Sequence, residues 1–107
     1  MTMTVEILYF QGCPSLDSTR AMVERVALEW DAQVVLVDVE RTPESIEGGF
    51  RGSPTVLVDG RDIEPDAQPA SGRELCCRRF DDAGAIRNEP PAAWLERALR
   101  DASERRA

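Results

Sequence analysis

The 107-residue chain contains no histidine and no lysine. Without an imidazole it cannot form a Ser-His or Cys-His nucleophile pair, a His-ligated zinc site or a histidine proton shuttle. Its 13 basic residues are all arginine, and 20 acidic residues leave a net charge of -7. Because gripping a phosphate backbone needs clustered cations, nucleic acid is not an expected partner. Any catalysis must therefore use thiols, carboxylates or backbone groups.

The chain also has no long apolar run, and no secretory leader is expected. No apolar run approaches the roughly 20 residues of a membrane span, and the N-terminus has neither the basic start nor the apolar segment of a signal peptide. A length of 107 residues suits one compact domain. We therefore expect a single cytoplasmic domain over residues 1–107, with a frayed tail at residues 103–107, no membrane partner and a monomer or dimer as the oligomeric state.

Cysteine is scarce, with three residues in the chain: Cys13, Cys76 and Cys77. An odd number in a reducing compartment argues against a structural disulfide framework and leaves free thiols, reactive thiols or soft-metal ligands. Neighbouring Cα atoms lie only about 3.8 Å apart, below the usual disulfide range of roughly 4.4–6.8 Å, so Cys76 and Cys77 are expected to rest as a dithiol. Together with Cys13 they could hold a thiophilic ion such as Cu(I), zinc or a mercury-like ion. In the alternative interpretation, one of the pair is buried in a strand and the other is incidental.

Charged residues near these thiols and in the turns have simple interpretations. Three arginines flank the cysteine pair and would favour its thiolate forms: Arg73, Arg78 and Arg79. The acid pairs fall in turns and are expected to be solvated rather than to form a metal site or an acid-base pair: Asp81-Asp82 and Asp59/Asp62.

Residues 6–12, with the sequence EILYFQG, match the recognition pattern of a viral protease that is widely used to remove purification tags. They could therefore be an expression scar. The alternative is a native strand, because residues 5–10 form an apolar and aromatic run that Gly12 and Pro14 bound. A scar would leave Cys13 without a strand to place it, so we interpret the stretch as native.

Apolar patterns along the rest of the chain predict a small α/β domain. Residues 16–30 carry apolar side chains at spacings of three, four and seven, which indicates an amphipathic helix. Residues 33–39 are apolar almost throughout, as in a strand that is buried on both faces and runs parallel to its neighbour. The other expected elements are, in chain order, a short helix between Thr42 and Gly48-Gly49, a hairpin over 55–64 around Asp59-Gly60, a loop over 64–73, an extended stretch over 75–80, a turn at 81–84 and a helix after Pro90-Pro91. The predicted order is βαβαββα, a small mixed sheet flanked by helices.

Cys13 lies between the first expected strand and the first expected helix. The unpaired N-H groups and the positive dipole end of a helix stabilise a thiolate at such a junction. Pro14 and Ser15 suit the start of the helix, whereas Asp17 opposes a thiolate by like-charge repulsion. In the simplest alternative, Cys13 is a small buried hydrophobic residue at the end of a strand.

Two stretches together resemble the thioredoxin superfamily: GCPSL at residues 12–16 and FRGSPTVLVDG at residues 50–60. Members have a Cys-Pro where the first strand meets the first helix, and a cis-proline loop followed by an apolar strand and a turn. The resemblance covers roughly residues 4–63. It implies a thioredoxin-like fold, a cis Ser53-Pro54 bond beside Cys13, and contact of an extended thiol substrate with Ser53, Pro54 and Thr55.

The chain departs from that family at one position of the thiol motif. Dithiol members carry a second cysteine three residues after the first, and here that residue is Leu16. The departure excludes a C-x-x-C mechanism. Two mechanisms remain. The protein acts through one thiol alone, or a cysteine elsewhere in the chain resolves the mixed disulfide.

The leading functional prediction is an atypical monothiol-type thiol-disulfide oxidoreductase that acts through Cys13, with Cys76 or Cys77 as second thiol. The pattern LYF-x-GCP at residues 8–14, followed by GSPTVLVDG at residues 52–60, is also similar to short bacterial proteins associated with mercury resistance. Organomercurial lyases use two cysteines and an aspartate, and Cys13, Asp17 and one of the adjacent cysteines could fill those roles, although the acid lies one residue further from its cysteine than in the lyase pattern. A third alternative is a non-catalytic binding module. The expected partner is a thiol, a disulfide or a thiophilic ion, and no cofactor is expected.

Overall fold

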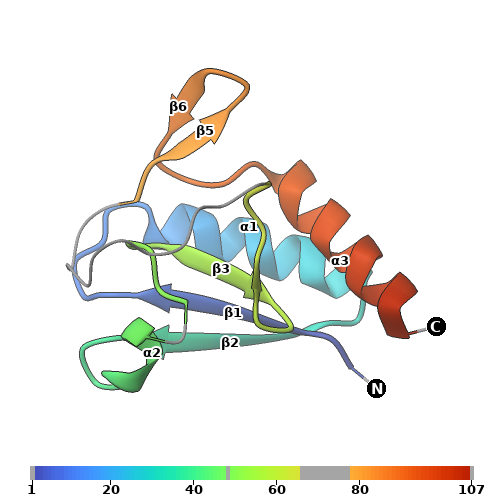
Figure 1. Ribbon diagram of the computed structural model, residues 1–107, viewed down its shortest axis with the longest axis horizontal. Coiled ribbons are helices and arrows are strands. Elements are labelled where there is room, and N and C mark those ends of the chain that lie inside the picture. Colours follow the sequence, from blue (N-terminus) through green and yellow to red (C-terminus); the bar gives the residue numbers. More distant parts are fainter. Residues whose placement is uncertain (1, 48, 66–77, 107) are drawn as a thin grey trace.

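The chain folds around a four-stranded mixed sheet (Figure 1). The structure is a computed structural model in which residues 2–47, 49–65 and 78–106 are described. The elements are, in chain order, β1 (Thr4–Tyr9), α1 (Leu16–Glu29), β2 (Gln33–Asp38), α2 (Glu44–Glu47), β3 (Thr55–Val58), β4 (Arg61–Asp62), β5 (Phe80–Asp82), β6 (Ala85–Arg87) and α3 (Ala92–Arg106). The expected combination of a small mixed sheet with helices is confirmed.

β1 lies inside the sheet, whose strand order is β2-β1-β3-β4. It pairs with β2 in parallel and with β3 in antiparallel, and Leu8 of β1 lies opposite Thr55 of β3. Parallel neighbours need a crossover connection, which α1 provides. The predicted parallel pair is therefore confirmed. The hairpin of β3 and β4 is confirmed as well, and its turn residues Asp59 and Gly60 have φ angles of 49° and 86°, as a type I′ turn requires.

β2 corrects one expectation about burial. Its residues were expected to be buried on both faces, but β2 is an edge strand, and from Val34 to Asp38 its side chains are only half-buried. A continuous apolar run looks the same in the sequence whether it forms a central strand or an edge strand. The order of strands depends on contacts between distant segments, which the run itself does not encode.

The side chains of β1 alternate between two apolar clusters, one on each face of the sheet. Ile7 packs in a cluster that includes Leu99 of α3, on the face that α1 and α3 cover (Figure 1). Leu8 packs in a smaller cluster with Phe50 and Leu57 on the opposite face. All five side chains are less than 5% exposed. The C-terminal half of β1, which leads to Cys13, is thus fixed from both faces.

The expected turn at residues 81–84 is the tip of a β-hairpin that the sequence did not predict. β5 and β6 pair in antiparallel around Ala83 and Gly84, whose φ angles are 53° and 94°. The N-H of Gly84 also donates to Asp81 Oδ1 at 2.8 Å. The two strands are only three residues long each, so period-two alternation is too short to recognise in the sequence.

Both long helices differ from expectation at one end. Ser15 precedes α1, but its side chain makes no capping hydrogen bond. At the other end of the chain, α3 continues to Arg106, whereas a frayed tail was expected from residue 103. No glycine or proline follows Pro91, and the last residues, ASERR, include good helix formers, so nothing stops the helix earlier.

The place of the EILYFQG stretch in the sheet predicts resistance to the tag-removing protease. Residues up to Tyr9 are hydrogen-bonded within β1, between β2 and β3, and cannot adopt the free extended form that a protease cleft binds. We expect no cleavage after Gln11 in native buffer and rapid cleavage at the same site in a fully unfolded, diluted sample. Electrophoresis after timed digestion measures both rates. Fast cleavage of the native chain would contradict the interpretation of this stretch as a central strand.

Candidate functional site

Cys13 lies in a tight turn that joins β1 to α1. Its N-H donates to the carbonyl of Phe10 at 3.3 Å, and its own carbonyl accepts the N-H of Leu16 at 3.2 Å. Gly12 precedes it with a φ of 86°, a left-handed conformation that favours glycine. The Cys13 side chain is a free thiol and is 8% exposed. The turn therefore holds the thiol at the predicted junction, with only a small edge open to solvent.

The first turn of α1 keeps unpaired backbone donors next to Cys13 in the chain. The carbonyl of Ser15 accepts hydrogen bonds from the N-H of Thr19 and from the hydroxyl of Ser18. Among the described residues, the N-H groups of Asp17 and Ser18 have no hydrogen-bond acceptor. The Asp17 side chain is exposed. The N-terminal end of α1 therefore has free N-H groups, whose partial positive charge suits an anion nearby.

The loop of Ser53, Pro54 and Thr55 lies beside the turn that carries Cys13. The N-H of Phe10 donates to Ser53 Oγ at 3.4 Å, which joins the end of β1 to this loop. All three loop residues are buried, and Ser53 is 1% exposed. The Ser53-Pro54 peptide bond is cis, as the resemblance implied. The predicted proline loop thus contacts the end of β1, three residues before Cys13.

The polar groups of this loop are already bonded within the chain. The carbonyl of Ser53 accepts the N-H of Arg78 at 2.9 Å. The hydroxyl of Thr55 donates to the carbonyl of Gly52 at 2.6 Å and accepts the N-H of Arg51 at 3.0 Å. The segment that begins at Arg78 therefore lies directly on the proline loop, a contact that the sequence did not predict.

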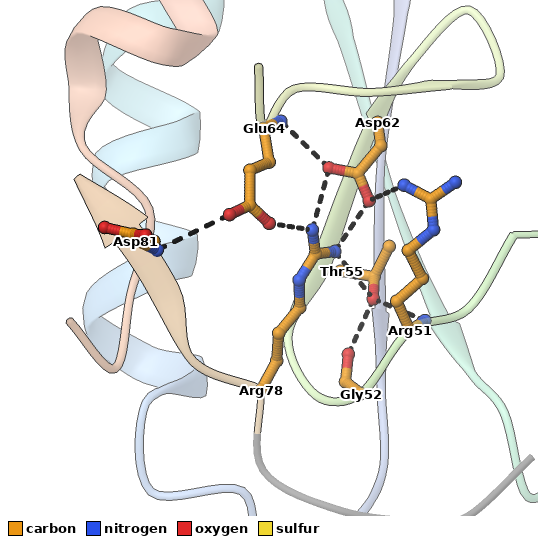
Figure 2. A network of polar contacts seen from close by, with 7 residues as sticks. All are labelled: Arg51, Gly52, Thr55, Asp62, Glu64, Arg78 and Asp81. Atoms are coloured by element: carbon orange, nitrogen blue, oxygen red, sulfur yellow. Dashed lines mark hydrogen bonds and ion pairs between the residues drawn. The ribbon is translucent and has the colours of Figure 1, made fainter. Parts of the chain in front are cut away.

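A buried ion-pair network fastens Arg78 to the hairpin of β3 and β4 (Figure 2). Its Nη1 and Nη2 donate to the two oxygens of Asp62 at 2.6 and 3.1 Å, and Nη2 also donates to Glu64 at 2.6 Å. Nη1 lies 3.3 Å from the hydroxyl of Thr55. The side chains of Arg78 and Asp62 are 5% and 6% exposed. The guanidinium also stacks over the ring of Phe80, 4.6 Å from its centroid.

One expectation about these charges is wrong. Asp62 is not a solvated turn residue, because Arg78 and Arg51 both pair with it in a buried position. Arg78 already pairs with Asp62 and Glu64, and its effect on the thiols of Cys76 and Cys77 stays a prediction. The signal in the sequence was the spacing of Arg78 and Phe80, two residues apart, which places a cation and an aromatic ring on the same side of an extended segment.

Cys76 and Cys77, together with Arg73, lie outside the described residues. The predicted soft-metal site of Cys13, Cys76 and Cys77 and the lyase-like set that adds Asp17 therefore stay predictions. Within the described ranges, no three cysteine or acidic side chains come together in a way that could hold a metal ion. Asp17 also makes no hydrogen bond or ion pair there.

Asp38, at the C-terminal end of β2, interacts with the residue before Gly12. Its Oδ2 accepts a hydrogen bond from Gln11 Nε2 at 3.2 Å, and its Oδ1 accepts the N-H of Glu40 at 3.0 Å. The Gln11 bond is the largest cause that holds the pKa of Asp38 below its ordinary value of 3.8, with the backbone N-H groups of Glu40 and Arg41 adding to it against the opposing effect of desolvation. The pair links the β1–α1 turn to the edge strand.

Removal of the Gln11 side chain should raise the pKa of Asp38 toward 3.8. Because the folded pKa is depressed, this carboxylate stabilises the fold above its ordinary pKa, and the contribution is lost as the pH falls through the folded pKa. A carboxyl NMR titration of Gln11→Ala measures the shift. Gln33→Ala, at the other end of β2, is the matched control and should leave the titration of Asp38 unchanged; an unchanged titration in Gln11→Ala would contradict the assigned cause.

Comparison of the chain with protein family models, curated proteins and solved structures finds no match. The helices in the described ranges are all too short or too polar to cross a bilayer.

Proposed function

We propose that the chain is a thioredoxin-like protein in which Cys13 is the nucleophile of thiol-disulfide exchange. The observation that carries the proposal is the hydrogen bond from the Phe10 N-H to Ser53 Oγ, which brings the proline loop to the turn of Cys13. The order of elements, with β1-α1-β2 followed by the β3-β4 hairpin and a last helix, agrees with the order that the resemblance implies.

The proposed chemistry is a two-step exchange. The Cys13 thiolate attacks one sulfur of a disulfide, a mixed disulfide forms on Cys13, and the other half leaves as a thiolate that takes a proton from water. A second thiol then attacks the mixed disulfide and releases the first half of the substrate. The substrate disulfide gains two electrons and two protons in total, and the two attacking thiols are joined as a disulfide.

Cys77 is the best candidate for the second thiol if the protein supplies it. The N-H of its chain neighbour Arg78 bonds to the Ser53 carbonyl, and Ser53 in turn bonds to Phe10. Neighbouring Cα atoms lie about 3.8 Å apart in a trans peptide chain. Cys77 is therefore the cysteine nearest in the sequence to the residue that bonds to the proline loop, and Cys76 is one residue further along the chain. If Cys77 is not used, one glutathione thiolate attacks the Cys13 sulfur and releases the first half of the substrate, and a second glutathione attacks the glutathione sulfur of the new mixed disulfide, which releases the Cys13 thiolate and oxidised glutathione.

Turnover of a small dialkyl disulfide, with glutathione as the reductant, tests the proposal. The wild-type chain should consume the disulfide faster than glutathione alone, and Cys13→Ser should return the rate to that background. Cys76→Ser/Cys77→Ser is the matched control for loss of thiols and should retain the glutathione-dependent reaction. Equal rates for the wild type and Cys13→Ser would overturn the proposal, and if thiol alkylation left partner capture unchanged, the non-catalytic module would be favoured instead.

A further inference from the structure

A second site lies between β4 and the C-terminal half of α3, away from Cys13. A cavity of about 480 Å³ opens there, and its lining includes none of the residues of the Cys13 turn or the proline loop. Val58, Ile63 and Ala98 give it apolar walls. Its volume falls in the range of roughly 300–1,000 Å³ that is typical of small-molecule sites.

Three arginines from two elements converge on this cavity: Arg61, Arg97 and Arg105. Arg97 and Arg105 are eight residues apart on α3 and so lie on one face of the helix, while Arg61 comes from β4. All three side chains are exposed, and in residues 2–47, 49–65 and 78–106 none of them forms a hydrogen bond or an ion pair. Their guanidinium donors are therefore available to a ligand.

The charge around the cavity is positive although the whole chain has a net charge of -7. Three acids also line the cavity: Asp62, Glu64 and Asp101. Arg78 pairs with Asp62 and Glu64, and Arg51 pairs with Asp62, so the charge of these two acids is already balanced. Among the lining residues that the structure describes, Asp101 alone then faces three arginines, which leaves an excess of two positive charges.

We propose that this cavity binds a small organic phosphate monoester. A phosphate monoester carries a charge of about -1.5 to -2 at neutral pH, which matches the excess of two. Guanidinium groups bind phosphate oxygens in bidentate geometry and with charge-assisted hydrogen bonds. The apolar walls of Val58, Ile63 and Ala98 suit an apolar or aromatic group on the ester. The site is independent of the thiol chemistry proposed above.

Titration of the full chain with phenyl phosphate, followed by amide NMR shifts, tests the proposal. We expect saturable shifts in residues 58–65 and in α3 from Arg97 onward, with an affinity about tenfold higher than that of inorganic phosphate because the ring covers apolar surface. Phenol alone should not saturate the site. Arg97→Gln and Arg61→Gln should each lower the affinity for phenyl phosphate by about tenfold, which is the effect of losing one charge-assisted hydrogen bond.

Arg100→Gln is the matched control, because Arg100 is an exposed arginine on the same helix that does not line the cavity. The affinity of Arg100→Gln for phenyl phosphate should equal the affinity of the wild type. The affinity of Cys13→Ser should also be unchanged. Equal affinities of Arg97→Gln, Arg61→Gln and Arg100→Gln would overturn the proposal. So would shifts that fail to saturate, or that appear mainly outside residues 58–65 and α3.

Discussion

Replacement of Arg78 by glutamine should lower the free energy of unfolding by about 3–5 kcal/mol, because it removes a buried cation shared by two acids, which leaves Glu64 without its ion-pair partner and Asp62 with Arg51 alone. Arg78 satisfies Asp62 and Glu64 together, and both acceptors are largely buried. Glutamine cannot supply the paired donors of a guanidinium or its charge. Since native domains are stable by only about 5–15 kcal/mol, the loss would be a large share of the total. Urea unfolding followed by circular dichroism measures it.

The Arg20-Glu24 pair supplies the control for this prediction. It is an ion pair four residues apart on α1, and its side chains are 52% and 54% exposed. Arg20→Gln should cost less than about 1 kcal/mol, as exposed pairs do. In the double variant Arg78→Gln/Asp62→Asn, the two losses should be less than additive, because both changes break the same contact. If Arg78→Gln cost no more than Arg20→Gln, the network would contribute little to the stability of the fold.

The second large effect is expected at Cys13. Cys13→Ser should abolish thiol-disulfide exchange, because a serine hydroxyl stays protonated near neutral pH and cannot form the mixed disulfide. Serine is close to cysteine in size, so the turn between Phe10 and Leu16 should keep its hydrogen bonds. A disulfide-reduction assay, combined with a circular dichroism spectrum of the same sample, separates loss of the nucleophile from loss of the fold. Residual exchange above the glutathione background would mean that another thiol carries the reaction.

The elements that the sequence predicted well are those whose signal is local. Each of these signals is formed by residues that are close together in the chain. They are the apolar runs of β1 and β2, the amphipathic period of α1 and the Asp59-Gly60 turn. The proline loop and Cys13 could be placed together because each belongs to a recognisable motif. The pairing of β1 with β3 and the hydrogen bond from Phe10 to Ser53 bring the end of β1 to this loop.

What the sequence did not predict depends on contacts between distant segments. Asp62 looked like a turn residue because its partner, Arg78, is 16 residues away in the chain. The edge position of β2 and the contact of Arg78 with the Ser53 carbonyl have the same origin. Strand order and long-range ion pairs are decided by which surfaces meet in the folded chain, and no spacing within one segment encodes them.

Mixed-disulfide formation on Cys13 is the most direct test of the proposed chemistry. In Cys76→Ser/Cys77→Ser, Cys13 is the only thiol, so any adduct with oxidised glutathione must form there. Intact-mass spectrometry of the folded variant should show one glutathione per chain, formed more slowly than on the unfolded variant because the side chain is only 8% exposed. Absence of the adduct on the folded chain, with full modification of the unfolded chain, would contradict the role of Cys13 as a nucleophile.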